Sequence, residues 1–378
     1  MEIEELALQR SKYKHLSDDE WRWFLQQVEG RERTADKLPT FAAISDWWYP
    51  VRLSCEQCSS EETARYKAEI VEGVRVESRK SIVDSRFVDL TGGYGVDTYF
   101  LSGLFGHTDY VEQNEELCRI ATHNFSIQSS AISIHHSTAE EFLQTAGLYD
   151  LIFMDPARRN SHGGKVFRLE DCAPNVTELL PALLAHLAPN GRLMVKLSPM
   201  LDITQAITTL SEVTWDIHIV AIRNEVKEVL LLSRGRGRIT AINLDKKEQA
   251  FSFMREEERL ATADYQLPVI RYLYEPNAAI LKAGAYKLVS ARFGLHKLDV
   301  NTHLYCSAGL VEDFPGRVWK VKSEGMRVER ANVMVRNYPL TAEQLKKKMR
   351  LKDGGEDFLI GARVAGRPTL FWAERVKK

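Results

Sequence analysis

A glycine-rich turn is the first feature of the sequence with the residue types of a ligand site. The segment FVDLTGGYGVD, residues 87–97, ends an apolar strand pattern and begins a helical one. Glycine in such a turn lets a ligand approach the backbone closely and allows positive φ angles. The N–H groups at the start of the following helix can bind an anionic or polar group. We therefore predict a ligand site in this turn.

Two carboxylates stand near this turn in the sequence. Asp89 ends the first strand, where an acid can bind the ammonium group of an amino-acid ligand. Glu112 ends the next strand, 23 residues later, where an acid can accept both hydroxyls of a ribose. A solvated loop residue is the alternative for Glu112, and the adjoining turn favours the ligand role. Thr98 replaces the third glycine of a dinucleotide fingerprint, which disfavours a nicotinamide cofactor.

The elements that must position these residues alternate over residues 86–233. Apolar strand patterns begin at Arg86, Asp109, Ala131, Asp150 and Gly191, with helical patterns between them at 96–105, 115–125, 139–146 and 176–187. Short strands separated by helices predict βαβ units and a parallel sheet. The patterns TWDIHIVAI and KEVLLLSR follow with no helix between them, which predicts an antiparallel hairpin.

The flanking regions have different patterns. Residues 1–79 predict helices, with capping boxes at Ser17-x-x-Glu20 and Ser59-x-x-Glu62. From residue 241 the pattern is that of one or two small α+β units: a helix over 277–293, short strands, a basic helix that begins after Thr341, and a final hairpin around AGRP. We predict four parts, over residues 1–79, 80–240, 241–330 and 331–378, and a ferredoxin-like arrangement is one option for the third.

Four segments in order, FVDLTGGYGVDT, YVEQNEELCRIATHN, HSTAEEFL and YDLIFMDPARR, resemble motifs I to IV of class I S-adenosylmethionine-dependent methyltransferases. The resemblance implies an α/β fold with a Rossmann-like, seven-stranded core and S-adenosylmethionine as cofactor. It implies cofactor contacts from Asp89, Thr91, Gly92, Gly93, Gly95, Glu112, Gln113, Thr138, Ala139 and Asp155. Thr91 and Thr138 depart from the family pattern, which usually has glycine and aspartate at these positions.

The whole chain is also similar to methyltransferases with a THUMP-like C-terminal domain, here residues 331–378. The segments that carry this similarity are EQCSSEETARYKA, DPARR and YPLTAEQLKKKMRLKDGG. THUMP domains proper belong to RNA-modifying enzymes, so this resemblance suggests RNA as a partner by analogy.

The segment DPARR, which begins at Asp155, follows the fourth strand, and ligands of open α/β sheets bind at the carboxyl ends of strands. It lacks the aromatic residue with which many amino-methylating enzymes stack a flipped base, and this disfavours such a target. Asp155 is expected to orient the acceptor. Arg158 and Arg159 suit a phosphate, and a salt bridge in this loop is an equal alternative for Arg159.

The order Lys67, Asp155, Lys196, Glu228 is similar to the Lys-Asp-Lys-Glu set of ribose 2′-O-methyltransferases. In that chemistry a lysine next to another cation acts as the base, and the acids hold the geometry. The alternative is that Lys67 and Glu228 are ordinary surface or salt-bridge residues.

Charge is distributed unevenly along the chain. Residues 241–378 contain 25 Lys and Arg against 17 Asp and Glu, a net charge of +8, and the first 240 residues have a net charge of −9. Basic residues gather on one predicted helix and just after it, at Lys346, Lys347, Lys348 and Arg350. They are expected to bind an RNA backbone. A solvated helix face is the alternative.

Composition excludes several classes of protein. The chain has 378 residues, of which 44% are hydrophobic and 27% charged, as in globular proteins, and no apolar run is long enough to span a bilayer. Five cysteines and no apolar signal segment favour the cytoplasm. Cys55-x-x-Cys58 is half of a zinc site and no second ligand pair follows it, so we expect no metal.

The alternatives to an RNA methyltransferase are a methyltransferase of a small molecule or protein, and a non-catalytic RNA-binding module.

Overall fold

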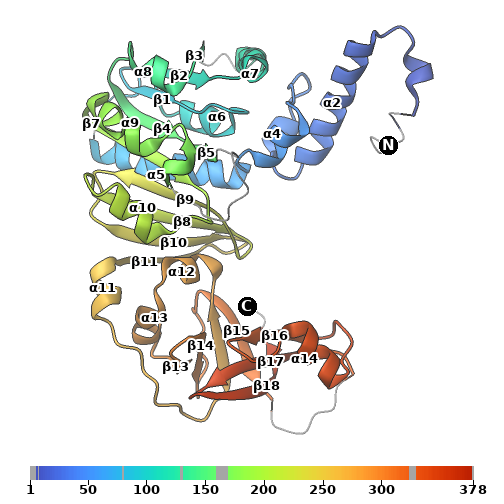
Figure 1. Ribbon diagram of the computed structural model, residues 1–378, viewed down its shortest axis with the longest axis vertical. Coiled ribbons are helices and arrows are strands. Elements are labelled where there is room, and N and C mark those ends of the chain that lie inside the picture. The colour runs from blue at the N-terminus through green and yellow to red at the C-terminus, as the bar shows by residue number, and fades with distance from the viewer. Residues whose placement is uncertain are drawn as a thin grey trace. The chain divides into compact units, whose positions relative to one another are not determined.

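The computed structural model describes residues 6, 8–78, 81–127, 131–158, 169–322 and 329–376, with the side chains of 75–78 and 158 left out. These residues divide into two compact units (Figure 1). The first contains the chain up to Thr214 together with Leu230–Arg234, and the second contains Trp215–Val229 and the chain from Gly235. The sequence boundaries at 79/80, 240/241 and 330/331 remain predictions.

The first unit begins with helices, as predicted for this region. They are η1 (Arg10–Tyr13), α2 (Asp18–Thr34), α3 (Pro39–Ala42), α4 (Arg52–Gln57) and α5 (Glu61–Ser78). Ser17 forms the predicted capping box of α2 with Glu20. The second predicted capping box, with Ser59 as the cap and Glu62 as its partner, is wrong. The hydroxyl of the next residue, Ser60, accepts the N–H of Thr63 at 3.2 Å. The neighbouring Ser59 hydroxyl instead donates to Asp97.

The alternating region forms the predicted βαβ units. Its elements are β1 (Arg86–Asp89), α6 (Val96–Ser102), β2 (His107–Glu112), α7 (Glu115–Ile127), β3 (Ile132–His136), α8 (Ala139–Leu143), β4 (Tyr149–Met154), β5 (Ala157–Arg158), η2 (Leu169–Asp171), β6 (Cys172–Ala173), α9 (Val176–Ala185), β7 (Leu187–Leu197) and α10 (Ile203–Thr209). Strands β3, β2, β1, β4 and β7 are neighbours in that order and are parallel. Their carboxyl ends therefore meet at one edge of the sheet.

Strands β8 (Trp215–Ile222) and β9 (Glu225–Ser233) form the predicted hairpin. Arg223 and Asn224 between them both have positive φ, as a two-residue hairpin turn of type I′ requires. The sheet order β3-β2-β1-β4-β7-β9-β8 is the seven-stranded core that the sequence predicted. Two further strands, β10 (Arg238–Leu244) and β11 (Gln249–Met254), extend the sheet beyond β8. The first half of β9 belongs to the second unit and its end to the first.

The rest of the second unit is the predicted α+β region. Its elements are α11 (Arg255–Leu260), β12 (Tyr272–Pro276), α12 (Ala278–Ala283), α13 (Tyr286–Phe293), β13 (His296–Asp299), β14 (Thr302–Ser307), β15 (Gly316–Val321), β16 (Asn332–Arg336), α14 (Ala342–Met349), β17 (Asp357–Val364) and β18 (Arg367–Arg375). The single helix expected over 277–293 is wrong. Gly284 takes a left-handed conformation at φ +73° and ends α12 there, because such a residue cannot continue a helix.

Seven strands of this unit form a second sheet, in the order β13-β14-β12-β15-β18-β17-β16. One face buries an apolar cluster that includes Leu273, Leu304, Trp319 and Ile360. A second cluster lies around Leu345 of α14, which Thr341 caps as predicted. In the part of the chain that is described, no helix has the length and apolar character to cross a bilayer.

Candidate active site

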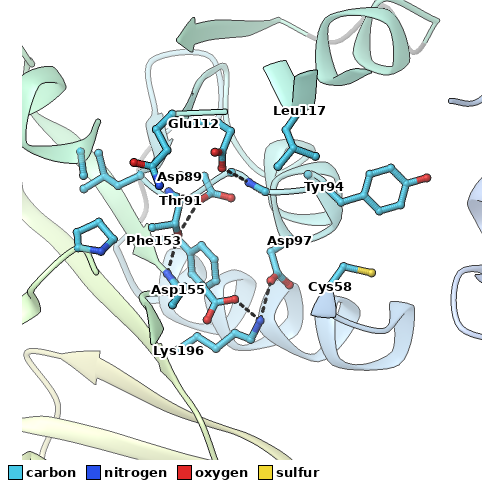
Figure 2. Close-up of a pocket in the computed structure, with 18 of the residues that line it drawn as sticks. Cys58, Asp89, Thr91, Tyr94, Asp97, Glu112, Leu117, Phe153, Asp155 and Lys196 are labelled. Carbon is cyan, nitrogen blue, oxygen red and sulfur yellow. Dashed lines mark hydrogen bonds and ion pairs between the residues drawn. The ribbon is translucent and has the colours of Figure 1, made fainter. Parts of the chain in front are cut away.

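A cavity of about 490 Å³ lies in the first unit, where the carboxyl ends of β1, β2, β4 and β7 meet (Figure 2). This volume lies within the range of small-molecule sites. Every residue predicted to contact the cofactor lines it: Asp89, Thr91, Gly92, Gly93, Gly95, Glu112, Gln113, Thr138, Ala139 and Asp155. The structure thus brings together residues from four strand ends that are far apart in the sequence.

The glycines of the turn are needed for conformation and for packing. Gly93 and Gly95 have φ of +56° and +81°, a region that other residues rarely adopt. A Cβ on Gly92 would lie 2.1 Å from the ring of Tyr110. The hydroxyl of Tyr110, in β2, donates to the carbonyl of Gly93 at 2.6 Å and so holds the turn against that strand. The turn is therefore preformed, with its backbone lining the cavity.

Glu112 lies at the cavity with its carboxylate held against the turn. One oxygen accepts the N–H of Gly93 at 2.9 Å, and the other accepts the N–H of Asn114 at 2.8 Å. A carboxylate offers about four lone-pair positions, so lone pairs are left for further donors. A ribose, with its two neighbouring hydroxyls, is the kind of group that this carboxylate could bind.

Asp89 is 1% exposed, and its carboxylate accepts hydrogen bonds from two nearby residues. One carboxylate oxygen accepts the N–H of Thr91 at 3.0 Å, and the other accepts the hydroxyl of Thr98 at 2.6 Å. Burial raises the pKa of Asp89 to about 7, although these two hydrogen bonds oppose the rise. A bound ammonium group would favour the ionised form. That role stays a prediction.

The two departures from the family pattern have structural reasons. The hydroxyl of Thr91 accepts the N–H of Asp155 at 2.7 Å and so links the end of β1 to the end of β4. The hydroxyl of Thr138 accepts the N–H of Glu141 at 3.2 Å, as the cap of α8. Both side chains hold walls of the cavity in place.

A network of charged side chains adjoins the cavity, which its members Asp97, Asp155 and Lys196 line. Lys196 donates from Nζ to Asp155 Oδ2 and, at 3.1 Å, to Ser59 Oγ. The same Nζ lies 3.7 Å from Asp97 Oδ2, and Lys67 Nζ lies 3.2 Å from Asp97 Oδ1. Figure 2 shows Lys196 extending between the two carboxylates. Lys67 and Lys196 of the predicted Lys-Asp-Lys-Glu set therefore both approach Asp97, and Asp155 joins this network through Lys196.

Asp97 and Ser59 were absent from the predicted set. An acid in the first turn of a helix is what the helix dipole favours, so Asp97 carries no distinctive sequence signal. Ser59 resembles a helix cap in the sequence. Burial alone would raise the pKa of Asp97, but the ammonium groups of Lys67 and Lys196 and the Ser59 hydroxyl lower it below its usual value. Asp97 is therefore ionised at neutral pH.

The remaining predicted site residues lie outside the lining of this cavity or outside the described residues. Glu228 is buried in β9, in the half of that strand that belongs to the second unit, and its part in the set stays a prediction. The backbone of Arg158 is in β5, without a described side chain, and Arg159 lies outside the described residues. Lys347, Lys348 and Arg350 are exposed on α14 and at its end, whereas Lys346 pairs with Asp353.

The cysteine pair carries no metal site within the residues described. Cys55 and Cys58 are free thiols, and burial raises the pKa of each. Cys58 lines the cavity, next to Ser59. No cluster of three or more His, Cys, Asp or Glu side chains suited to a metal ion occurs in the described ranges.

Comparison with known proteins places the chain in a family. It is 31% identical to the crystal structure of a "putative methyltransferase" from Porphyromonas gingivalis W83, over 96% of this chain and 92% of that one, with a TM-score of 0.84. A model of a ferredoxin-like domain matches residues 272–315, and a model of a THUMP-like domain matches residues 312–375. A search of curated proteins finds no match.

Two more distant structures resemble only part of the chain. A methyltransferase that depends on S-adenosylmethionine, from Agrobacterium tumefaciens, is 16% identical over 47% of this chain and 62% of its own, with a TM-score of 0.35. The Thermus thermophilus methyltransferase of 16S rRNA N2 G1207, in complex with the cofactor and guanosine, is 17% identical over 45% and 43%, with a TM-score of 0.34.

The sheet order and the cavity at its carboxyl edge define a class I methyltransferase that uses S-adenosylmethionine. The residues fit this cofactor: a turn that requires glycine, a carboxylate beside it with free lone pairs, and a second, buried carboxylate. The chain belongs to the family of the Porphyromonas methyltransferase, and its own C-terminal residues 312–375 match a THUMP-like domain.

Proposed function

We propose that this methyltransferase acts on RNA and methylates a ribose 2′-hydroxyl. The observation that carries the proposal is the pair of Lys196 and Asp155, which lines the same cavity as the glycine-rich turn. A lysine held against a carboxylate suits the activation of a hydroxyl group. The residues after Asp155 are Pro156 and Ala157, so this segment provides no aromatic ring to stack a flipped base.

The side chains at this end of the cavity have distinct tasks in this proposal. S-adenosylmethionine, when bound, supplies an electrophilic methyl group, and its sulfur keeps the electron pair of the broken carbon–sulfur bond. Asp155 orients the acceptor hydroxyl, whose oxygen forms the new bond to carbon. The hydroxyl proton passes to the pair of Lys196 and Asp155. Since the donor is already activated, positioning and proton removal are the main tasks of the protein.

RNA as the acceptor is supported by the second unit. The THUMP-like model matches residues 312–375, and the chain from residue 241 has a net charge of +8. Helix α14 exposes Lys347 and Lys348, with Arg350 at its end. Exposed cations gathered in this way suit a phosphate backbone. Arg158 and Arg159 are proposed to bind phosphate near the acceptor.

Mass spectrometry of nucleosides tests the proposal directly. RNA from cells with and without this chain would be digested and compared. We expect one 2′-O-methylated nucleoside to be lost in its absence and to return with the wild-type chain. Unchanged RNA nucleosides would overturn RNA as the acceptor, and loss of a base-methylated nucleoside would overturn the ribose target.

Substitution of the two lysines tests the acceptor chemistry. Lys196→Ala and Lys67→Ala are each expected to lower turnover by about 100-fold or more, the range typical of general acid–base groups. The affinity for S-adenosylhomocysteine, measured by calorimetry, is expected to change little, because these substitutions leave the glycine-rich turn and Glu112 intact. Wild-type turnover in both variants would remove the lysines from the mechanism.

A further inference from the structure

Asp97 lies at the centre of the charged network. Lys67 approaches one of its carboxylate oxygens at 3.2 Å, and Lys196 approaches the other at 3.7 Å. Asp97 is the second residue of α6, directly after the glycine-rich turn. The same element that shapes the cofactor turn therefore also supplies the carboxylate between the two lysines.

The network is buried, so its charges interact strongly. The side chains of Lys67, Asp97 and Lys196 are 0%, 9% and 12% exposed. Charges removed from water need partners at close range, and their attraction is screened less than at a surface. Without Asp97, the two lysines would lose the carboxylate that both approach.

Ser59 completes the arrangement. Its hydroxyl donates to Asp97 Oδ2 at 2.6 Å and accepts from Lys196 Nζ at 3.1 Å. The hydroxyl therefore bridges Asp97 and Lys196 across a gap that is long for a direct hydrogen bond. Since Nζ also donates to Asp155, it is held from several sides.

We infer that Asp97 is a positioning residue for methyl transfer, which acts through Ser59 to hold Lys196 against Asp155. It also balances the buried charge of Lys67. The inference rests on the proposed role of the Lys196 and Asp155 pair. Asp97 itself acts on the lysine and not on the acceptor. Its removal should therefore alter the rate and its pH dependence more than cofactor affinity.

The test compares Asp97→Asn with Asp109→Asn. Asp109 is a matched control, since its side chain is 13% exposed, lies in the same unit, and belongs to a separate cluster with Arg86, His135 and Tyr149. The initial rate would be measured with S-adenosylmethionine labelled in its methyl group and total RNA from cells lacking the chain. Affinity for S-adenosylhomocysteine, which has no sulfonium charge, would be measured in parallel.

Asp97→Asn is expected to lower the rate by about tenfold to 100-fold, with affinity for S-adenosylhomocysteine within about threefold of wild type. Removal of a neighbouring carboxylate disfavours the ammonium form of a lysine. The limb of the pH–rate profile that depends on Lys196 should therefore move to lower pH. Asp109→Asn should affect thermal stability without this movement. Equal rates and pH profiles in the two variants would overturn the inference.

A second readout does not depend on the acceptor. Reductive methylation with formaldehyde and cyanoborohydride labels only neutral amines, and peptide mass spectrometry gives the rate at Lys196. Asp97→Asn should raise this rate by at least about fivefold, and Asp109→Asn should not change it. If wild-type protein methylates no RNA, the proposed function fails while this labelling still decides the inference. An unchanged labelling rate in Asp97→Asn would overturn it.

If Asp97→Asn does not fold, Ser59→Ala tests whether Lys196 is held through the Ser59 hydroxyl. This variant keeps every charge and removes only the bridging hydroxyl. A loss of at least about threefold in rate, with unchanged affinity for S-adenosylhomocysteine, is the expected result. A wild-type rate and labelling profile in Ser59→Ala would show that Lys196 is not held in this way.

Discussion

Asp89 and Asp97 stand at the two ends of the glycine-rich turn, and their surroundings push their pKa values apart. Burial raises the pKa of Asp89 to about 7, and its hydrogen bonds come from uncharged groups. Burial also acts on Asp97, but the neighbouring lysines outweigh it and lower the pKa. Near neutral pH, Asp97 is thus ionised, whereas Asp89 is protonated in part of the molecules.

Asp89 should make the stability of the first unit depend on pH. Its pKa is higher in the folded chain than in the unfolded chain, so its contribution to stability is present at low pH and is lost as the pH rises through about 7. Asp89→Asn, which cannot ionise, should therefore melt higher than wild type at a pH of about 8, with a much smaller difference at about 4, where the carboxyl of the unfolded chain also keeps most of its proton. Thermal melts without ligand at both pH values provide the measurement. A variant that melts lower than wild type at the higher pH would contradict the pKa assignment.

The sequence identifies the residues of the glycine-rich turn better than the charged network around Lys196. Gly93 and Gly95 are recognisable because only glycine readily takes their φ angles, and Glu112 because of its spacing from the turn. Asp97 and Ser59 act through contacts between α6, β7 and the chain before α5, which no local pattern specifies. Their residue types also have ordinary structural explanations as helix-terminal residues.

At the scale of elements, the turn between β1 and α6 determines the shape of the cavity. Gly92 packs against Tyr110, Gly93 takes a positive φ, and Gly95 begins α6 from a left-handed conformation. The requirement at Gly92 comes from the Tyr110 ring, and those at Gly93 and Gly95 come from the backbone conformation. They explain why three glycines occur within four residues.

Gly93→Ala should therefore disturb the turn through backbone strain alone. A Cβ there would have no heavy atom closer than the Thr91 carbonyl oxygen at 3.8 Å, so steric overlap is not the cause. The left-handed conformation should lower the free energy of unfolding by about 1–2 kcal/mol, and we expect weaker binding of S-adenosylhomocysteine.

Gly73→Ala is the matched control, because Gly73 lies inside α5 with no neighbour within 4 Å. It should raise stability by about 0.5–1 kcal/mol without affecting binding. Chemical unfolding and calorimetry of both variants provide the comparison. Equal effects of the two substitutions would refute a special conformational role for Gly93.

The alternating core was predictable because each strand is a short apolar run and each helix has its own pattern. The second unit was less so. Strands β10, β11, β12 and β13 were not predicted, because no alternation with helices marks them and their residue pattern depends on the sheet that they join. The break at Gly284 was missed because one glycine inside a helical pattern is often tolerated.

At the scale of the whole molecule, charge is divided along the chain. The first 240 residues carry a net charge of −9 and the remainder +8. The exposed cations of α14 belong to the segment that matches the THUMP-like model. The net positive charge that would attract a polyanion such as RNA therefore belongs to the second unit.

Binding of RNA is expected to weaken steeply as salt increases, because bound cations on the nucleic acid are released. Lys347→Ala with Lys348→Ala should reduce the slope of log affinity against log salt by about 1.4, at about 0.7 for each lost contact. Lys246→Ala with Lys247→Ala removes the same charge from an exposed segment of the same unit and serves as the control. Fluorescence anisotropy over a salt series gives both slopes. Identical slopes in the two double variants would remove α14 from the RNA surface.

A crystal structure of the chain with S-adenosylhomocysteine tests the central claim most directly. We predict density in the cavity of the first unit, with the ribose hydroxyls on Glu112, the adenine beside Thr138 and Ala139, and the sulfur facing Lys196 and Asp155. An empty cavity in a crystal saturated with the ligand, or a ligand bound away from the glycine-rich turn, would contradict the account.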